Sequence, residues 1–155
     1  MSVREELALE YLRIQESDIP ELLAADQEGY PDPWTQGMFR QEIINPVSEF
    51  FVVRNDGNLV AYVGFWMALD EAHITKVTVL PAYRQRGIGR EVLEWLLRRA
   101  EQMGANLARL EVRESNAPAR ALYVAAGFEQ IGVRKGYYAC DNEAAICMSK
   151  PLRGN

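Results

Sequence analysis

The chain has 155 residues, of which 48% are hydrophobic and 25% are charged, values typical of one globular domain with its own core. Its formal net charge of −5 argues against a general nucleic-acid-binding protein, although it suits a basic peptide as partner. No apolar run approaches the roughly 20 residues of a membrane span, and the acidic N-terminus is unlike a signal peptide. The two cysteines, Cys140 and Cys147, make neither a disulfide framework nor, with a single histidine, a metal site. We therefore expect a cytoplasmic protein without a metal ion.

The N-terminal third predicts one strand followed by two helices. Alternating apolar residues indicate a strand over residues 7–14. Asp18 is the expected N-cap of a helix that ends at Gly29, because an acidic residue follows three positions later and a proline falls in the first turn. After a proline-rich loop, Thr35 is expected to cap a second helix, which Pro46 stops.

The middle of the chain predicts an antiparallel meander and then a long helix. The strands of the meander are expected at residues 50–53, 59–68 and 72–79. The helix after them presents one apolar face, made of Ile88, Val92, Leu93, Leu96, Leu97, Ala100 and Met103. Glu94 and Arg98 are spaced to pair on its opposite face, and Gly104 is the expected C-terminal stop.

The last third predicts a strand, a helix and two final strands. The strand covers residues 106–112, and the helix begins at Ser115-Asn116 and ends at Gly127. The final strands are expected at residues 128–138 and 144–149. The resulting order, β-α-α-β-β-β-α-β-α-β-β, predicts one α/β domain over residues 1–155. Its mixed sheet of about seven strands, flanked by four helices, is antiparallel at first and parallel around the long helix.

The stretch between the third strand of the meander and the long helix has the composition of an anion site. A β-branched strand stops at a proline, and a basic segment with Gly87 and Gly89 leads into the helix. Glycines let the backbone approach a ligand, while the helix start offers free N–H groups and the positive end of its dipole. Arg84, Arg86 and Arg90 add charge that can fork onto phosphate oxygens. A basic, solvated turn is the alternative interpretation.

Three polar side chains are predicted to gather beside this loop. Glu111 lies near the end of the strand over residues 106–112, Asn116 follows it, and Tyr123 lies about two turns into the next helix. Ligands of parallel strand–loop–helix units bind at the carboxyl ends of the strands. A carboxylate, an amide and a phenol at this edge are a suitable acid–base set for acyl transfer.

Two motifs resemble known sequences. Arg84, Gly87 and Gly89 fit the R/Q-x-x-G-x-G/A pattern of the GNAT acetyltransferase superfamily. The segment LEVRESNAPARALY, closed by AGF at residues 126–128, resembles bacterial ribosomal-protein alanine N-acetyltransferases. The pair Pro33-Trp34 and the late tyrosine pair also resemble that family, so the likeness spans most of the chain. The strand over residues 75–79 is less apolar than in the family, and residues 139–145 differ from it.

The resemblance implies a GNAT-like fold, acetyl-CoA as co-substrate and a role for each matching residue. Glu111 would be the general base and Tyr123 the general acid. The residues implied in binding the co-substrate are Val77, Val79, Arg84, Gln85, Arg86, Gly87, Ile88, Gly89, Arg90 and Asn116. The residues implied in binding the acceptor are Trp34, Tyr137 and Tyr138, of which strand alternation turns at most one tyrosine toward the site. Backbone N–H groups of the strand ending at Val79 would hold the oxyanion.

Simpler interpretations stay open for single residues. Glu111 could be a solvated partner of Arg109 or Arg113, Asn116 only a helix cap, and Trp34 a core side chain. We expect the single histidine, His73, to be structural or exposed.

Three functions are compatible with the sequence. The first is acetylation of a protein N-terminus, possibly that of a ribosomal protein, by a monomer or homodimer without nucleic-acid or membrane partners. The second is acetylation of a small amine such as a polyamine, an amino acid or an antibiotic. The third, a non-catalytic acyl-CoA-binding protein, leaves the pair of Glu111 and Tyr123 without a purpose.

Overall fold

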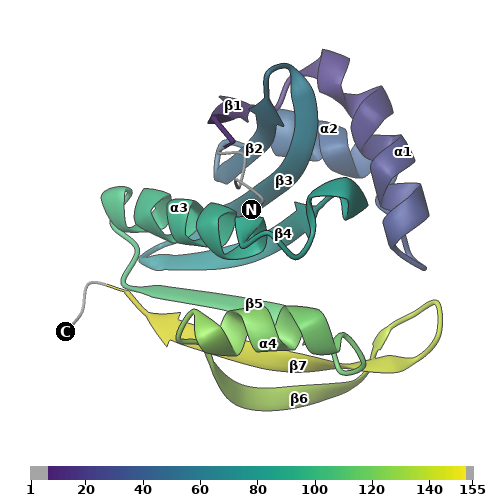
Figure 1. Ribbon diagram of the computed structural model, residues 1–155. Coiled ribbons are helices and arrows are strands. Elements are labelled where there is room, and N and C mark those ends of the chain that lie inside the picture. The colour runs from purple at the N-terminus through teal and green to yellow at the C-terminus, as the bar shows by residue number, and fades with distance from the viewer. Residues whose placement is uncertain (1–6, 153–155) are drawn as a thin grey trace, which may run out of the picture.

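The computed structural model describes residues 7–152, which form a seven-stranded sheet with helices on both faces (Figure 1). In chain order the elements are β1 (Leu9–Arg13), α1 (Ile19–Gly29), α2 (Gln36–Ile44), β2 (Ser48–Asn55), β3 (Asn58–Ala68), β4 (Glu71–Val79), α3 (Ile88–Gln102), β5 (Leu107–Arg113), α4 (Ala117–Ala125), β6 (Glu129–Tyr138) and β7 (Glu143–Pro151). Short 3-10 turns precede α1 and α3. The predicted α/β class and element order are confirmed. No helix among the described residues is long and apolar enough to cross a membrane.

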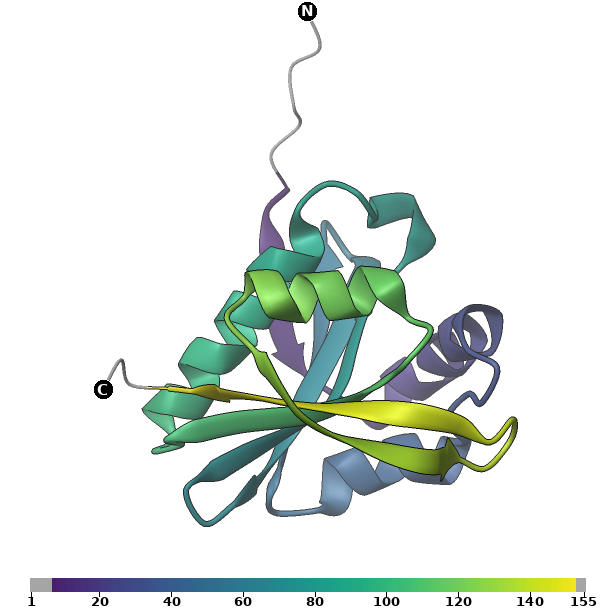
Figure 2. The same ribbon diagram turned by 90° about the horizontal axis from the view of Figure 1, so that it is seen from below.

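The sheet order is β1-β2-β3-β4-β5-β7-β6. Strands β1 to β4 form the predicted antiparallel meander, and β4 and β5 are parallel. Strand β7 lies between β5 and β6 and is antiparallel to both (Figure 2). This insertion sends the β6–β7 hairpin toward the loop after α1, so that two segments far apart in sequence flank the same end of the sheet (Figure 2).

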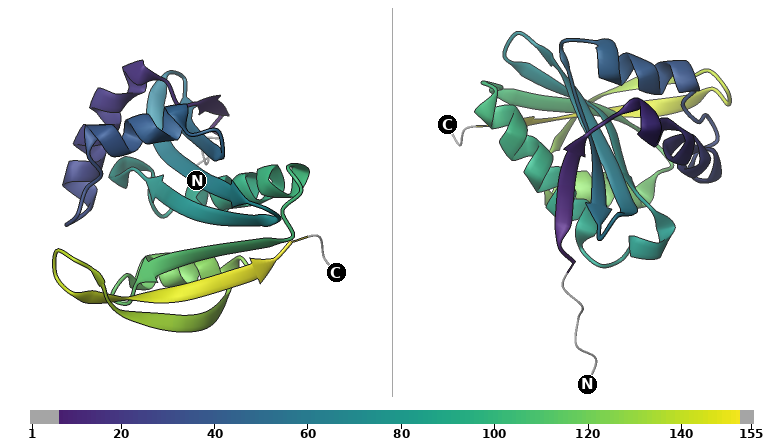
Figure 3. Two further views of the ribbon diagram at one scale, coloured as in Figure 1. Left: turned by 180° about the vertical axis from the view of Figure 1, so that it is seen from behind. Right: turned by 90° about the horizontal axis from the view of Figure 1, so that it is seen from above.

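Strands β4 and β5 pair over only three positions, from Glu71 with Leu107 to His73 with Arg109. Beyond these pairs the strands separate, and the two halves of the sheet diverge toward the carboxyl ends of both strands (Figure 3). Parallel strands normally continue their ladder of hydrogen bonds. The separation leaves backbone groups of both strands free to meet a ligand at this fork.

Two cores lie on opposite faces of the sheet. Helices α3 and α4 cover one face, and the buried side of α3 consists of Ile88, Val92, Leu93, Leu96, Leu97 and Ala100, as predicted. Helices α1 and α2 cover the other face of β2 and β3 (Figure 3). Met103 was expected on the buried face, but it is 41% exposed because the helix ends at Gln102.

Two expected local contacts are wrong. Asp18 does not cap α1, because its carboxylate accepts the N–H of Gln15 and pairs with Arg54 on β2. Glu94 pairs with Arg90, one turn earlier in α3, at 2.6 Å between Arg90 Nε and Glu94 Oε1. Arg98 instead lies near the phenol of Tyr11, on which it acts electrostatically. Asp18 is thus taken by a residue of a distant strand, whereas Glu94 takes the other arginine available at i,i+4 spacing.

Candidate active site

The loop between β4 and α3 has the backbone geometry of an anion site. Gly87 is the N-cap residue of α3 and has φ of +77°, while Gln85 also has positive φ, at +63°. The first N–H groups of a helix have no partners within it, so those of α3 are available to a ligand. Arg84 donates from Nε to the carbonyl of Val79 at 3.1 Å, and the Arg86 guanidinium lies 5.6 Å from the Tyr83 ring centre.

The two glycines of this loop have different roles. A Cβ at Gly87 would meet nothing within 4 Å, but its left-handed backbone favours glycine. A Cβ at Gly89 would point inward, 3.5 Å from Leu122 Cδ2 and 3.8 Å from Val79 Cγ2. A side chain at Gly89 would thus begin in ordinary van der Waals contact with α4 and β4. A Cβ at Gly87 faces open space, whereas the role of Gly89 in binding a phosphate stays a prediction.

A β-bulge in β4 reorganises the strand at the fork. The register with β3 shifts between the Gly64–Lys76 and Phe65–Ile74 pairs, which leaves Thr75 as the extra residue. As a result Ile74 and Val77 both pack on the α3 side, whereas Lys76 faces α1. The Thr75 hydroxyl is the one buried side-chain polar atom without a hydrogen-bond partner among the described residues. An unpaired buried hydroxyl is costly, so Thr75 is an exception to the usual pairing of buried polar side chains.

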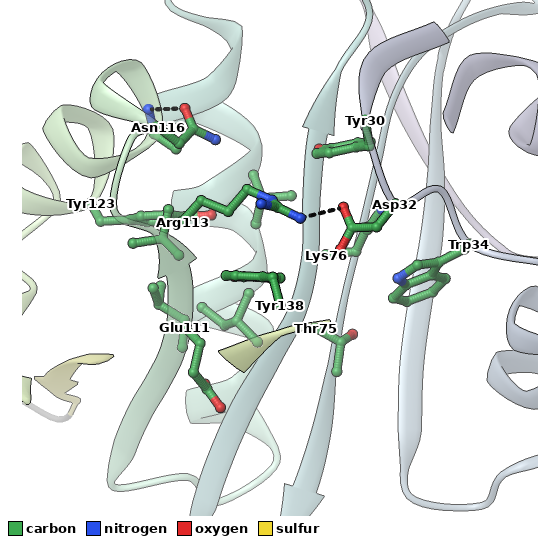
Figure 4. A pocket seen from close by; sticks show the side chains of 15 residues that line it. Tyr30, Asp32, Trp34, Thr75, Lys76, Glu111, Arg113, Asn116, Tyr123 and Tyr138 are labelled. Atoms are coloured by element: carbon green, nitrogen blue, oxygen red, sulfur yellow. Dashed lines mark hydrogen bonds and ion pairs between the residues drawn. The ribbon is translucent and has the colours of Figure 1, made fainter. Parts of the chain in front are cut away.

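An inner cavity of about 180 Å³ lies in the fork between β4 and β5 (Figure 4). Glu111, Asn116 and Tyr123 all line it, as the sequence predicts, together with Val77 and Thr75 of β4. The loop of Arg84 to Arg90 lies beyond this cavity, where β4 runs into α3. The structure thus brings the predicted acid–base set together at the carboxyl ends of the two strands.

Asn116 and Tyr123 are both held by α4. The Asn116 side chain accepts a hydrogen bond from the backbone N–H of Ala119 and so caps α4. Asn116 also lines the inner cavity. Tyr123 is 7% exposed and packs edge-to-face on Phe128, with ring centres 5.7 Å apart. Burial raises the pKa of the Tyr123 phenol well above its ordinary value. The phenol therefore keeps its proton at neutral pH and can donate it.

A larger outer cavity, of about 410 Å³, adjoins the inner one. Both cavities are lined by Trp34, Ile74, Thr75, Glu111 and Tyr138. The outer cavity adds Met38, Gln41, Glu42, Trp66, His73 and Tyr137. Four of its eleven lining residues are tryptophan or tyrosine. The Glu42 carboxylate is already bonded to Ser48 and to the indole of Trp66.

Both late tyrosines line the outer cavity, which corrects the expectation that at most one would face the site. Gly136 has φ of +64°, and the β6–β7 register shifts between Arg134 and Tyr138. This irregularity breaks the strand alternation. Tyr137 and Tyr138 stand edge-to-face with ring centres 5.0 Å apart.

Glu111 is bonded to a residue that the sequence analysis set aside. Glu111 Oε2 and His73 Nε2 lie 2.8 Å apart. The His73 hydrogen bond, opposed by burial, holds the pKa of Glu111 below its ordinary range. Neither Arg109 nor Arg113 is its ion-pair partner. A signal was present in the sequence, because His73 and Glu111 both lie on polar faces of strands that were predicted to be parallel neighbours.

Arg113 ties the two flanking loops together. Its guanidinium pairs with Asp141 and Glu143 at the β6–β7 hairpin, each at 2.8 Å from Nη1, and with Asp32 after α1 at 3.0 Å from Nη2. Figure 4 shows this side chain reaching from β5 across the inner cavity to Asp32. The guanidinium also lies 4.0 Å from the ring centre of Tyr138. It therefore spans the cavity between the two halves of the sheet.

A buried ion pair fixes the position of Trp34. The Asp26 carboxylate is fully buried and accepts the Tyr62 hydroxyl at 2.6 Å, the Trp34 backbone N–H at 2.7 Å and Lys76 Nζ at 2.9 Å. Lys76 also lies 4.7 Å from the Trp34 ring centre and 4.0 Å from that of Tyr30. Burial lowers the pKa of Lys76, and Asp26 opposes that shift. Sequence analysis missed this network, although a lysine within a β-branched strand was its visible sign.

Comparison with known proteins agrees with this geometry. Residues 19–128 match the Acetyltransferase (GNAT) family. The ribosomal protein bS18-alanine N-acetyltransferase of Escherichia coli K12 is 33% identical over 141 residues, which are 90% of this chain and 95% of that protein. N-alpha-acetyltransferase RimI of Mycobacterium tuberculosis is 35% identical over 123 residues, 77% of this chain and 76% of that protein.

Solved structures support the same relation. The crystal structure of the ribosomal-protein-S18-alanine N-acetyltransferase from Escherichia coli superposes with a TM-score of 0.84 at 31% identity, covering 94% of each chain. The family resemblance predicted from the loop and the LEVR segment is thereby confirmed. The chain belongs to the acetyltransferase (GNAT) family and is an N-acetyltransferase.

Proposed function

We propose that this chain transfers the acetyl group of acetyl-CoA to the α-amine of a protein N-terminus. The observation that carries the proposal is the position of Glu111, whose side chain lines both the inner cavity at the fork and the outer cavity beside the flanking loops. An acceptor amine from the outer cavity and a thioester from the inner one would meet beside this carboxylate. Relatives that act on ribosomal protein bS18 and on N-terminal α-amines support the choice of acceptor.

The described residues suit acetyl-CoA as co-substrate. The open backbone at Gly87 and the free N–H groups at the start of α3 fit a pyrophosphate, with charge from the exposed Arg84, Arg86 and Arg90. The rest of the set predicted to hold the co-substrate comprises Val77, Val79, Gln85, Ile88, Gly89 and Asn116. Of these, Val77 and Asn116 line the inner cavity, where the pantetheine arm would lie.

The proposed reaction is a direct transfer. An α-ammonium group has a pKa of about 8, above that of a carboxyl group, so its proton passes to Glu111 against the pKa difference and must then be carried away. The free amine adds to the thioester carbonyl, and the tetrahedral oxyanion is held by a backbone N–H of β4 beside the Thr75 bulge. The C–S bond then breaks, and Tyr123 donates its proton to the departing thiolate. The nitrogen returns a second proton to the tyrosinate, which restores the enzyme.

The wall of the outer cavity favours a peptide over a polyamine. A polyamine needs several unpaired carboxylates, but Glu42 is bonded to Ser48 and Trp66, and Glu111 to His73. The aromatic wall of Trp34, Tyr137 and Tyr138 instead suits a short extended chain with an apolar side chain. We propose a ribosomal-protein N-terminus as the acceptor and the cytoplasm as the location, in line with the relatives' names.

A coenzyme A release assay tests the proposal. The panel contains peptides with alanine, serine, glycine or methionine at position one, the same peptides already acetylated at the α-amine, and polyamines, amino acids and aminoglycosides. We expect release only with peptides that have a free α-amine, and mass spectrometry should place the acetyl group there. Faster turnover of a small amine would refute the peptide acceptor. Tight acetyl-CoA binding without turnover of any acceptor would favour the acyl-CoA-binding alternative.

A further inference from the structure

We propose that His73 carries protons away from Glu111 to solvent, and so acts as the exit of the proton path in acetyl transfer; this inference rests on the proposed function. The two residues come from different strands. His73 pairs with Arg109 at the last position where β4 and β5 are joined, and Glu111 lies two residues further along β5. The bond of 2.8 Å between His73 Nε2 and Glu111 Oε2 therefore closes the fork at its base.

The His73 side chain is more exposed to solvent than the Glu111 side chain, which gives proton transfer between them an outward direction. The Glu111 side chain is 10% exposed and the His73 side chain 30%. Glu111 lines both cavities, whereas His73 lines only the outer one, which is the side open to the flanking loops. A proton received by Glu111 at the junction thus has a hydrogen-bonded route outward through the imidazole ring.

The proton balance of the reaction requires such an exit. An ammonium group and a thioester give an amide, a thiol and one free proton. Two protons leave the nitrogen, of which one ends on sulfur through Tyr123 and the other is first taken by Glu111. If Glu111 kept that proton, the carboxyl group could not serve the next turnover. Transfer to His73 Nε2, with the ring hydrogen on Nδ1, forms an imidazolium that releases a proton into the outer cavity.

The surrounding charges favour release from Glu111. The His73 bond, Arg134 of β6 and Arg109 of β5 all hold the pKa of Glu111 below its ordinary range, against the effect of burial. A carboxyl group with a lowered pKa gives its proton up readily. The other titratable groups that line the outer cavity with His73 are Glu42 of α2 and the two phenols of Tyr137 and Tyr138. Burial raises the pKa of both phenols, so they stay neutral in the physiological range.

The first test separates proton transfer from positioning. The amide of His73→Gln can still donate to Glu111 but cannot take up a proton. We expect kcat near neutral pH to fall by about 10- to 100-fold, a range that reaches the lower end of general acid–base effects, with acetyl-CoA affinity unchanged. The deficit should shrink as pH rises, because the acceptor amine then loses its proton to bulk base. Equal kcat for both proteins across pH 6 to 10 would overturn the inference.

Chemical rescue provides a second test. His73→Ala should be inactive or slow, and added imidazole should restore turnover in proportion to its unprotonated concentration, because the outer cavity is large enough to admit it. A bulky sulfonate buffer with similar pKa should not rescue it. Gln41→Ala changes another wall residue of the same cavity and should show no imidazole response. Melting temperatures and acetyl-CoA titrations verify that each variant folds.

Rescue specific to His73→Ala supports the relay, and its absence in a folded variant overturns it. The two levels of the proposal fail in distinguishable ways. An inactive wild type would overturn both the proposed function and the relay. An active wild type with an equally active His73→Gln would overturn the relay alone.

Discussion

Breaking the buried ion pair of Asp26 and Lys76 should strongly destabilise the protein. Asp26→Ala removes the acceptor of three short hydrogen bonds and leaves the Lys76 ammonium, which is 8% exposed, without its counter-charge. Breaking a buried pair in this way costs about 3–5 kcal/mol. Since a domain of this size has a free energy of unfolding of only about 5–15 kcal/mol, the loss is a large share of the total.

Urea denaturation followed by far-UV circular dichroism measures this loss by linear extrapolation. The single variants Asp26→Asn and Lys76→Met, with the double variant, form a cycle that isolates the coupling of the two charges. We expect the double variant to be markedly more stable than the sum of the single losses predicts. Glu94→Gln breaks the exposed pair with Arg90, whose side chains are both 45% exposed, and is the matched control that should change little.

Asp26→Ala should also impair the proposed acceptor site, because the Asp26 carboxylate accepts the Trp34 backbone N–H at 2.7 Å and so anchors that residue. We expect KM for a peptide acceptor to rise more than KM for acetyl-CoA. A loss below about 1 kcal/mol in Asp26→Ala, or additive single variants, would refute the reasoning that the pair is a buried, mutually compensating unit.

Three further predictions concern the chemistry and the loop. Tyr123→Phe should bind acetyl-CoA normally and turn over roughly 10²-fold more slowly, the scale of a lost general acid, and unchanged turnover would leave Tyr123 a packing residue. The lowered pKa of Glu111 keeps its carboxylate ionised through neutral pH, so the acid limb of kcat/KM should follow the acceptor ammonium group, near pH 8. Glu111→Gln should lose most activity at neutral pH and regain part of it at higher pH. A uniform decrease in its activity from pH 6 to 10 would contradict a role as base. Gly87→Val should weaken acetyl-CoA binding in calorimetric titration, because valine is strained at the φ of +77° that this residue has at the start of α3. The control Gly57→Val is strained in the same way, at φ of +84° in the β2–β3 turn, and should lower the melting temperature but leave acetyl-CoA affinity intact.

The sequence by itself determined the elements and their order, because those depend on local patterns. Neighbouring residues are enough to predict the apolar stripe of α3, the Thr35 cap of α2 and the end of β4 at Val79, two residues before Pro81. The gathering of Glu111, Asn116 and Tyr123 was predictable as well, because parallel strands place their carboxyl ends together.

Only the tertiary structure decided which side chains face the cavities and which residues they are hydrogen-bonded to. The bulge at Thr75 breaks the alternation of β4. The irregularity at Gly136 breaks that of β6, so that both late tyrosines line the outer cavity. The partner of Glu111 depended on which polar residue of β4 lies beside it at the fork. The sequence offers several cationic side chains as possible partners for each carboxylate, and local sequence patterns do not select one of them. The packing of β4 against β5 and α1 selects His73 for Glu111 and Lys76 for Asp26, because each pairing shields a charge that folding removes from water.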